Sequence, residues 1–187
     1  MEPMLKPYDK EMFYRYLDKA KIYFEYGSGG STYQASIRSN IQKIYSVESD
    51  LTWHNTLKSK IPDSKKVEYL YANMNTLPDT FGGPGPYCTL EQKKAYSDQI
   101  FKSNGVDLVL IDGRFRVACC LKAFNVIGAD CLVAFDDFLD RKQYHVVLHY
   151  YDKIESTVDK SMVILKKKPG IPIVSNTAIM AYQGVLD

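Results

Sequence analysis

Five short apolar runs, each followed by residues that favour a turn, do most to restrict the fold of this 187-residue chain. They cover residues 22–26, 41–47, 67–71, 106–111 and 131–135. Such near-continuous runs are typical of strands in a parallel sheet, because a strand buried on both faces needs apolar side chains on both sides. The pattern therefore predicts a parallel sheet that is covered by helices on both faces.

The segments between these runs carry the signals of helix ends. Asp50 is a favourable N-cap, Thr89 and Gln92 form a capping box, and Gly128 is a helix stop. Helices are therefore expected over residues 32–38, 51–60, 90–103 and 116–127. Alternating strands and helices predict a doubly wound α/β sheet with right-handed crossovers.

The two ends of the chain add three elements to the expected single domain, which spans residues 1–187. A helix over residues 8–20 is expected ahead of the first strand. Residues 153–158 and 161–168 flank Asp159-Lys160 and predict a hairpin of two final strands.

Two segments have no regular pattern. Residues 73–89 contain Gly82-Gly83-Pro84-Gly85-Pro86, which continues neither a helix nor a central strand. Such a long loop is either a functional lid or a surface excursion, and the sequence leaves both readings open. The tail over residues 169–187 mixes proline, glycine and apolar residues, and it either packs on the body or contacts a partner.

Composition narrows the class of protein. Hydrophobic residues make up 45% and charged residues 25%, which is enough for a well-formed core. The formal net charge of +2 is too small to call for a nucleic acid or a membrane surface as partner. The cysteines form no Cys-x-x-Cys pair, and no stretch approaches the roughly 20 apolar residues of a spanning helix. We therefore expect a soluble, cytoplasmic protein with buried, reduced thiols at Cys88, Cys119, Cys120 and Cys131.

A glycine-rich turn, residues 25–32, links the first strand to the first helix after it. Such a turn lets a ligand approach the backbone closely. It lacks the Gly-Lys-Ser/Thr ending of triphosphate-binding loops, and the dinucleotide pattern would require glycine where Thr32 stands. We expect a different cofactor, contacted by the loop residues Gly27, Ser28, Gly29, Ser31 and Thr32.

Two carboxylates narrow the identity of this cofactor. Glu25 precedes the first glycine by two residues, where it would oppose a pyrophosphate but suit an ammonium group. Glu48 ends the second strand, where an acid followed here by Ser49 can accept hydrogen bonds from both hydroxyls of a ribose. A ligand with an amino acid at one end and a ribose at the other fits both, and S-adenosylmethionine is such a ligand.

In residues 24–32 and 45–50 the chain resembles the class I S-adenosylmethionine-dependent methyltransferases, over roughly residues 20–168. The resemblance implies a seven-stranded Rossmann-like sheet of order 3-2-1-4-5-7-6 whose last-formed strand is antiparallel. It also implies adenine contacts near Asn73 and Met74. Trp53 is similar to an aromatic residue that often follows the ribose acid, although packing of its helix explains it equally well.

Carboxylates also follow the fourth and fifth strands. Because ligands bind beyond the carboxyl ends of strands in open α/β sheets, Asp112, Asp136 and Asp137 should face one crevice. The pattern is similar to metal-dependent catechol and sugar O-methyltransferases, and this resemblance implies that the three aspartates bind Mg²⁺. A second explanation stays open: Asp112 contacts the amino group of the cofactor, and the other two cap a helix or pair with Arg114 and Arg116.

The acid–base group and the acceptor contacts are less defined. The catechol enzymes carry a lysine three residues after the fourth-strand acid, and Phe115 stands there in this chain. The base is expected to be His149 or an aspartate, Asp112 or Asp136, with His145 as another candidate, although a packed or solvated position explains either histidine as well. Arg114 and Arg116 are expected to bind an anionic group of the substrate, and Tyr87 to contact it. The alternative for Arg116 is that it only starts the next helix.

The sequence therefore predicts an O-methyltransferase that acts on a sugar, a glycan or another small hydroxyl-rich acceptor and releases S-adenosylhomocysteine. Residues 112–116 also resemble methyltransferases of carbohydrate-modifying systems, including those of large DNA viruses, which would place the protein in host cytoplasm. An NAD-dependent oxidoreductase and a non-catalytic binding module are the alternatives. A nucleic-acid methyltransferase is disfavoured, because Asp112-Gly113-Arg114-Phe115 replaces the Asn/Asp-Pro-Pro-Tyr/Phe signature.

Overall fold

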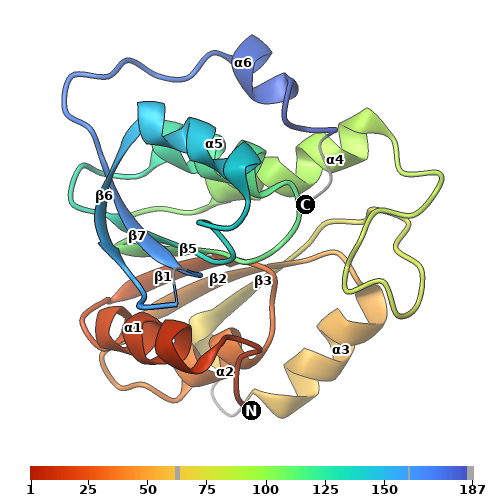
Figure 1. The fold of residues 1–187 in the computed structure, drawn as a ribbon. Coiled ribbons are helices and arrows are strands. Elements are labelled where there is room, and N and C mark those ends of the chain that lie inside the picture. Colours follow the sequence, from red (N-terminus) through yellow and green to blue (C-terminus); the bar gives the residue numbers. More distant parts are fainter. Residues whose placement is uncertain (62–63, 160, 185–187) are drawn as a thin grey trace.

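The protein is a three-layer α/β structure, seen here in a computed structural model that describes residues 1–61, 64–159 and 161–184. A seven-stranded sheet lies between two helical layers (Figure 1). Its strands are β1 (Ile22–Tyr26), β2 (Lys43–Glu48), β3 (Val67–Tyr71), β4 (Leu108–Ile111), β5 (Leu132–Phe135), β6 (Tyr151–Ser156) and β7 (Val163–Lys167).

The strand order is β3-β2-β1-β4-β5-β7-β6, as the resemblance implied. Strands β1 to β5 pair in parallel, whereas β7 is antiparallel to both β5 and β6. The carboxyl ends of β1 to β5 therefore meet at one edge, where β1 turns into the glycine loop. Ligands of such sheets bind at this edge, so the residues of its turns, and not those of the core, determine which ligand is bound.

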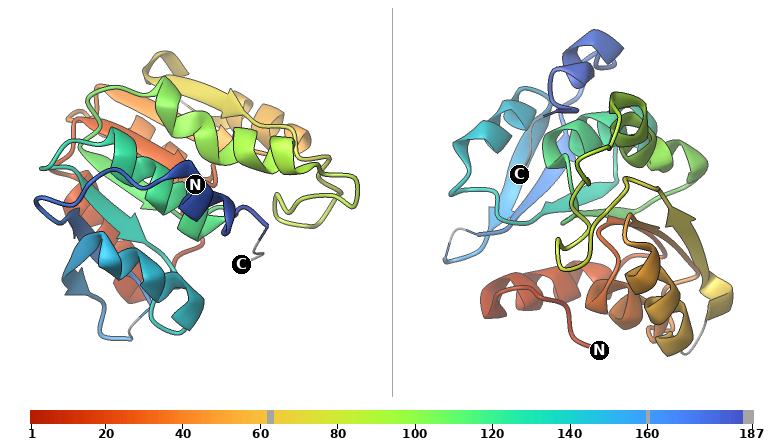
Figure 2. Two further views of the ribbon diagram at one scale, coloured as in Figure 1. Left: turned by 90° about the horizontal axis from the view of Figure 1, so that it is seen from above. Right: turned by 90° about the vertical axis from the view of Figure 1, so that its right-hand side faces the viewer.

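Helices cover both faces of the sheet. On one face lie α1 (Pro7–Leu17), α2 (Gly30–Ser36) and α3 (Leu51–Lys60). On the other face lie α4 (Leu90–Ser97), α5 (Arg116–Val126) and α6 (Asn176–Met180), as both views of Figure 2 show. Short 3₁₀ segments are η1 (Ser64–Lys66), η2 (Asp98–Lys102) and η3 (Lys142–His149).

Each face of the sheet has its own apolar core. Phe13 and Leu17 of α1 and Leu57 of α3 pack on one face, and all three are buried. Residues of α5 pack on the other face, where Phe124 contacts the rings of Tyr150 and Tyr151 edge-on. Burial on both faces explains why the strands read as continuous apolar runs rather than as alternating ones.

Several boundaries differ from the prediction. The helix expected over residues 90–103 is α4 followed by the 3₁₀ segment η2, and η3 was not anticipated. The tail packs on the body: Val174 and Ile179 are buried, and Asn125 of α5 exchanges two hydrogen bonds with the backbone of Val174. The expected hairpin exists as β6 and β7, but the predicted turn residue Lys160 lies outside the described residues.

No helix among the described residues is long and apolar enough to cross a lipid bilayer. Cys119, Cys120 and Cys131 are buried, as predicted, and Cys88 is half-buried.

Candidate cofactor and acceptor site

The glycine loop packs directly against the turn that follows β4. Gly27 has a φ of +93°, and a Cβ atom there would lie 2.8 Å from the carbonyl oxygen of Asp112. Gly113 is equally confined, because a Cβ there would overlap the hydroxyl of Tyr96. Only glycine fits at these two positions, because the turns after β1 and β4 pack closely against each other.

Gly29 and Gly30 have different surroundings. A Cβ on Gly30 would overlap the backbone of Glu2 and Pro3, so the N-terminal segment crosses the loop there. Apart from its two chain neighbours, a Cβ on Gly29 would meet no atom of the described residues within 4 Å. Gly29 therefore exposes its backbone to an open space that a ligand can fill.

Glu25 lies beneath the loop and is fully buried. Its carboxylate accepts hydrogen bonds from the hydroxyls of Tyr23 (2.9 Å), Ser31 (2.5 Å), Ser46 (2.7 Å) and Thr32. Burial raises the pKa of Glu25, and these hydroxyls counteract the rise. Four donors occupy all the accepting positions of an ionised carboxyl group. Glu25 is therefore not free to bind an ammonium group directly, which corrects the sequence prediction.

The same network holds the polar side chains of the glycine loop. The Thr32 hydroxyl also accepts the N–H of Gly29 at 2.9 Å, and the Ser28 hydroxyl bonds that of Ser46 at 2.6 Å. Ser31 is buried against Glu25. These side chains point into the protein, so the surface that faces the crevice is the loop backbone.

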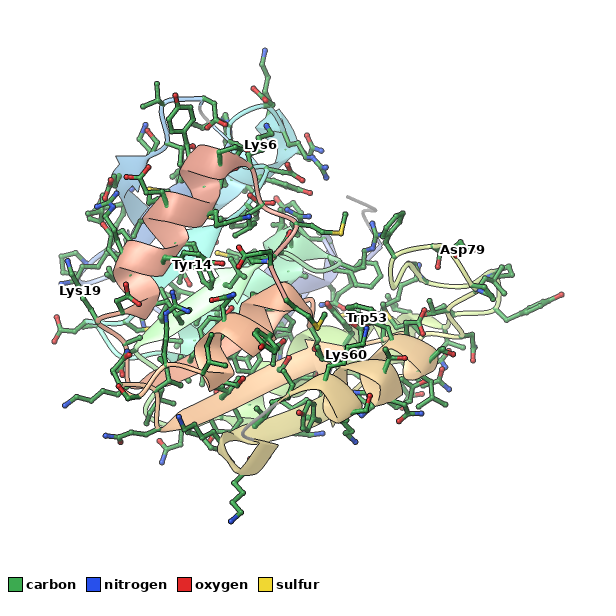
Figure 3. All side chains as sticks on the ribbon, turned by 90° about the horizontal axis from the view of Figure 1, so that it is seen from below. Lys6, Tyr14, Lys19, Trp53, Lys60 and Asp79 are labelled. Atoms are coloured by element: carbon green, nitrogen blue, oxygen red, sulfur yellow. The ribbon has the colours of Figure 1, made fainter. Side chains whose placement is uncertain are left out.

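Trp53 fixes the loop from the side. Asp50 caps α3 by accepting the Trp53 N–H at 2.9 Å, and the indole Nε1 donates to the carbonyl of Ser28 at 2.9 Å. In Figure 3, Trp53 lies between α2 and α3, near the loop that carries Asp79. Trp53 thus contacts the glycine loop and does not only pack its own helix.

Glu48 ends β2, as predicted, and is only 6% exposed. Its Oε1 accepts the N–H groups of Ser49 at 2.6 Å and Asp50 at 2.8 Å, whereas the described residues give Oε2 no hydrogen bond. Burial raises the pKa of Glu48 to about 7. The side chain is thus fixed through one oxygen and keeps the other for a ligand.

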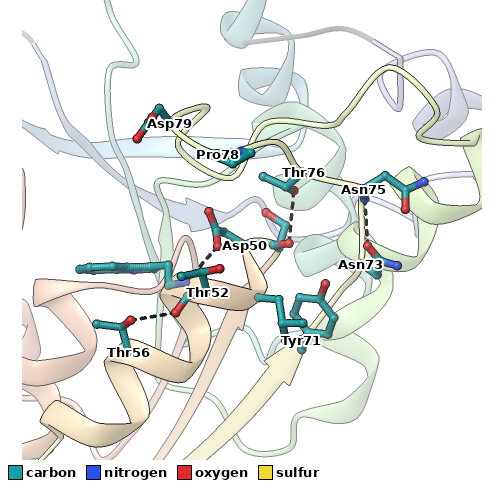
Figure 4. A pocket seen from close by; sticks show the side chains of 12 residues that line it. Asp50, Thr52, Thr56, Tyr71, Asn73, Asn75, Thr76, Pro78 and Asp79 are labelled. Carbon is teal, nitrogen blue, oxygen red and sulfur yellow. Dashed lines mark hydrogen bonds between the residues drawn. The ribbon is translucent and has the colours of Figure 1, made fainter.

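A pocket of about 440 Å³ opens beside these residues, between the start of α3, the end of β3 and the loop that follows. Figure 4 shows Asp50 and Thr52 on the α3 side and Asn73 on the β3 side. Asn73 is exposed and lines the pocket, so it is available for the predicted contact. Met74 is fully buried in the core and does not line it.

The three aspartates after β4 and β5 come together, but around an arginine. Arg116 Nη2 lies 3.2 Å from Asp112, and Nη1 lies 3.4 Å from Asp137 and 3.8 Å from Asp136. Arg116 Nη1 also donates to the backbone carbonyl of Asp136 at 2.8 Å. The guanidinium supplies the neutralising charge for which the sequence argument invoked a metal.

The described residues contain no group of three His, Cys, Asp or Glu side chains arranged to hold a metal ion. A divalent ion would need the carboxylate oxygens that Arg116 occupies. The donor set as arranged therefore does not fit Mg²⁺. Arg116 is 8% exposed and committed to these aspartates, so the predicted grip on a substrate anion is corrected as well.

Asp112 and Asp136 form a tight acidic pair. Burial and then the Asp112 carboxylate raise the pKa of Asp136 to about 8, and burial raises that of Asp112. Oδ1 of Asp136 is buried and has no hydrogen-bond partner in the described part of the chain.

The other predicted acceptor residues are dispersed. Arg114 Nη2 donates to the carbonyls of Thr80 and Phe81, at 2.9 and 3.0 Å, so this arginine binds the loop after β3. Tyr87 lies on the same long segment and is 84% exposed.

His149 lies at the wrong end of the sheet for catalysis. Tyr151, two residues later, pairs with Lys167 of β7, and the adjacent Lys166 pairs with Leu132 at the start of β5. Asp136 follows the other end of β5. His145 lies nearer to it, stacked on Phe138 with ring centroids 5.2 Å apart.

The sequence did not indicate Tyr23 and Ser46, two of the residues that bond Glu25 beneath the glycine loop. Ser46 is a polar residue within an apolar run, and it pairs in register with Glu25 on the neighbouring strand. Two polar groups at the same height of adjacent buried strands would have indicated a hydrogen bond. Nor did the sequence indicate Arg141, which pairs with Asp137 at 2.9 Å.

Comparison with known proteins gives structural matches only. No family model and no curated protein matches the sequence. A methyltransferase-like protein from Silicibacter pomeroyi superposes with a TM-score of 0.76 at 24% identity, over 97% of this chain and 96% of that one.

Two further structures are more distant. A caffeoyl-CoA O-methyltransferase candidate from Staphylococcus aureus gives a TM-score of 0.58 at 17% identity, covering 89% of this chain and 86% of the other. An rRNA methylase from Streptococcus thermophilus gives 0.57 at 10% identity, covering 88% and 99%. With its strand order and antiparallel β7, this chain has the class I methyltransferase fold.

Proposed function

We propose that this protein is an S-adenosylmethionine-dependent methyltransferase. The observation that carries the proposal is Glu48, a buried acid at the carboxyl end of β2 whose Oε1 is held by two backbone N–H groups. An acid at this position accepts hydrogen bonds from both ribose hydroxyls. The adjoining pocket has room for the adenine of the cofactor, and the open space at Gly29 has room for its amino-acid part.

Asp112 replaces Glu25 in our assignment of the ammonium site. It directly follows β4, its backbone touches the glycine loop at Gly27, and its side chain is 26% exposed. An anionic carboxylate there would pair with the ammonium of the cofactor. Glu25 would act from below, as a buried negative charge that disfavours phosphate in the loop.

An NAD-dependent oxidoreductase is the second candidate, and the sheet argues against it. Dinucleotide-binding domains have the parallel order 3-2-1-4-5-6, whereas β7 here is inserted antiparallel between β5 and β6. The third glycine of the dinucleotide loop is also absent, since Thr32 holds that place.

The acceptor that suits the crevice best is a neutral, hydroxyl-rich molecule such as a sugar or a glycan. Carboxylates wall the crevice, and hydroxyl groups donate to carboxylates. Arg114, Arg116 and Arg141 are all bonded to protein groups, so they offer little to an anionic acceptor. The fold itself does not select the acceptor, because it is shared by proteins named for caffeoyl-CoA and for rRNA.

In the proposed reaction, Asp136 is the base. S-adenosylmethionine, when bound, supplies a methyl group on a positively charged sulfur. Asp136, in its ionised form, would accept the proton of the acceptor hydroxyl, while the bound cofactor would supply the methyl group to that oxygen and leave as neutral S-adenosylhomocysteine. A pKa of about 8 suits this task, because a base works best near the operating pH. No step in this scheme uses a metal.

Calorimetry with S-adenosylhomocysteine tests the cofactor. We expect saturable binding by the native protein, at least roughly tenfold weaker in Glu48→Ala, and no binding of NAD. Equal affinities of the native protein and the variant would reject the ribose assignment.

A transfer assay with labelled cofactor tests the acceptor. Free sugars, glycans, catechols and oligonucleotides should be compared under one condition. Transfer to sugars alone supports the proposal, transfer to oligonucleotides contradicts it, and cofactor binding without any transfer favours the non-catalytic alternative.

A further inference from the structure

The loop after β3 covers the ribose acid. We call residues 76–86 the roof loop. Its Gly82 is buried, and the Ser49 hydroxyl donates to the Gly82 carbonyl at 2.7 Å. A Cβ on Gly82 would lie 2.8 Å from Ser49 Oγ and 3.2 Å from Glu48 Oε1. The Gly82 backbone therefore sits directly against the carboxylate to which we assign the ribose.

The roof loop is strained where it makes this contact. Asp79, Phe81 and Gly82 have φ values of +60°, +50° and +73°. The left-handed region is unfavourable for a bulky residue such as phenylalanine. The Phe81 ring is 81% exposed, so packing of the ring does not compensate for the strain. Other contacts must hold this backbone in place.

Arg114 supplies those contacts. Its Nη2 donates to the Thr80 carbonyl at 2.9 Å and to the Phe81 carbonyl at 3.0 Å, which are the two carbonyls flanking the strained N–Cα–C unit of Phe81. Charged donors make the stronger hydrogen bonds. The N–H of Arg114 donates in turn to the Tyr96 hydroxyl at 3.3 Å. One side chain from the β4 end thus spans the crevice to the roof loop.

We propose that Arg114 is a positioning residue that holds residues 80–82 over Glu48, so that breaking its contacts opens the site for cofactor exchange. The inference rests on the proposed function for the identity of the ligand, but not for the existence of the roof. It gives Arg114 a role at the cofactor, whereas the sequence suggested one at the acceptor.

Trp53 makes the exchange measurable. It is the only tryptophan of the chain, and it lines the pocket beside the roof loop. Stopped-flow fluorescence can therefore follow the association and dissociation of S-adenosylhomocysteine. In Arg114→Gln, which loses the charged donor, we expect both rate constants to rise roughly tenfold or more. Arg114→Lys keeps the charge and should lie between this variant and the native protein.

A variant with the opposite effect sharpens the test. Phe81→Gly removes the left-handed penalty and should slow exchange by severalfold, because the closed roof is then less strained. Arg15→Gln is the matched control: Arg15 is an exposed arginine of α1 that pairs with Glu155, and its loss should leave both rates unchanged.

Hydrogen exchange on the ligand-free proteins gives the second readout. The amides of residues 80–83 should exchange roughly tenfold faster in Arg114→Gln, with the thermal midpoint changed by only a few degrees. Unchanged protection of these amides, or unchanged ligand kinetics in a variant whose amides are less protected, would overturn the proposal. If the native protein binds no S-adenosylhomocysteine, the proposed function fails and the exchange role fails with it; hydrogen exchange still decides whether Arg114 holds the roof.

Discussion

At Gly29 of the glycine loop, the packing of the protein does not require a glycine. Within the described part of the chain, no atom beyond the two neighbouring residues lies within 4 Å of its Cβ position, and its φ of 176° is extended backbone. Gly29→Ala should therefore fold with a stability within about 1 kcal/mol of the native value. It should nevertheless bind S-adenosylhomocysteine at least roughly tenfold more weakly, because the methyl group would occupy the space left for the ligand. Thermal unfolding and calorimetry on the same sample check both parts.

Substitutions of two other glycines serve as controls for this result. Gly128→Ala, beyond α5, also adds a methyl group to open space and should change neither quantity. Gly30→Ala would overlap the backbone of Glu2 and should destabilise the fold by roughly 1–3 kcal/mol. Unchanged ligand affinity in Gly29→Ala would contradict our placement of the cofactor.

Glu48, to which we assign the ribose, lowers the stability of the fold when it is ionised. Its pKa is about 7 in the folded protein, against 4.5 for an unperturbed glutamate. Folding therefore favours the protonated form, and the stability present below pH 4.5 is lost as the pH rises through 7. Glu48→Gln should remove this loss and become more stable than the native protein by up to about 3 kcal/mol at pH 9.

Denaturant unfolding at pH 5 and at pH 9 checks the sign. The stabilising effect of Glu48→Gln should grow with pH while its affinity for S-adenosylhomocysteine falls. An effect of equal size at both pH values would show that the Glu48 carboxyl does not titrate in this range.

Arg116 leads to a prediction about metals. Because its guanidinium already bonds the three aspartates, methyl transfer should keep its full rate after treatment with a chelator. Added Mg²⁺ should raise the rate by less than about twofold. Loss of activity in chelator that Mg²⁺ restores would show that a metal displaces Arg116 during the reaction.

At the scale of elements, Glu25 joins β1, β2 and α2 through hydroxyls that come from all three. Glu25→Gln places an amide NH₂ group where hydroxyls already donate, so several of these bonds must break or reverse. We expect a loss of roughly 2–4 kcal/mol in stability, measured by denaturant unfolding.

A matched variant separates this network from ordinary burial. Tyr23→Phe removes one of the four donors and should cost only about 1 kcal/mol. If Glu25→Gln costs no more than Tyr23→Phe, the network does not hold the elements together.

The order of elements could be predicted from the sequence, because both faces of the sheet are buried and the strands are therefore apolar throughout. Strands β1 and β3 have the same bounds as the apolar runs that predicted them. The direction of polar side chains could not be predicted in the same way. Glu25 looks like a ligand of the cofactor in sequence, but Ser46 on the neighbouring strand, which only the register reveals, holds it inside.

The convergence of Asp112, Asp136 and Asp137 was also predictable, since it follows from strand ends meeting at one edge. Their counter-charge was not. Arg116 begins α5, and a first-turn arginine could equally face solvent; only the backbone turn at Phe115, with its φ of +54°, aims it back at the aspartates.

At the scale of the whole molecule, the C-terminal segment closes one helical layer. Ile179 of α6 is buried beside α5, and the Gln183 amide donates to the Ser97 hydroxyl of α4 at 2.6 Å. Ile179→Ala should therefore cost roughly 2–4 kcal/mol in stability. Its affinity for S-adenosylhomocysteine should stay within twofold of the native value, because the glycine loop leads into α2, which lies on the opposite face of the sheet from α6. A comparable loss of affinity would indicate that the two layers are coupled through the sheet.

The hydroxyl groups that bond Glu25 are shielded from water, since Tyr23, Thr32 and Ser46 are fully buried and Ser31 is only 5% exposed. Their protons should exchange so slowly that they give separate lines in a proton NMR spectrum, where ordinary serine and threonine hydroxyls merge with the solvent signal. Filling the open space above Gly29 would disturb those lines through the Thr32 hydroxyl, which accepts the Gly29 N–H. The signals of these hydroxyl protons would thus report, without any label, whether a ligand occupies the space at the glycine loop.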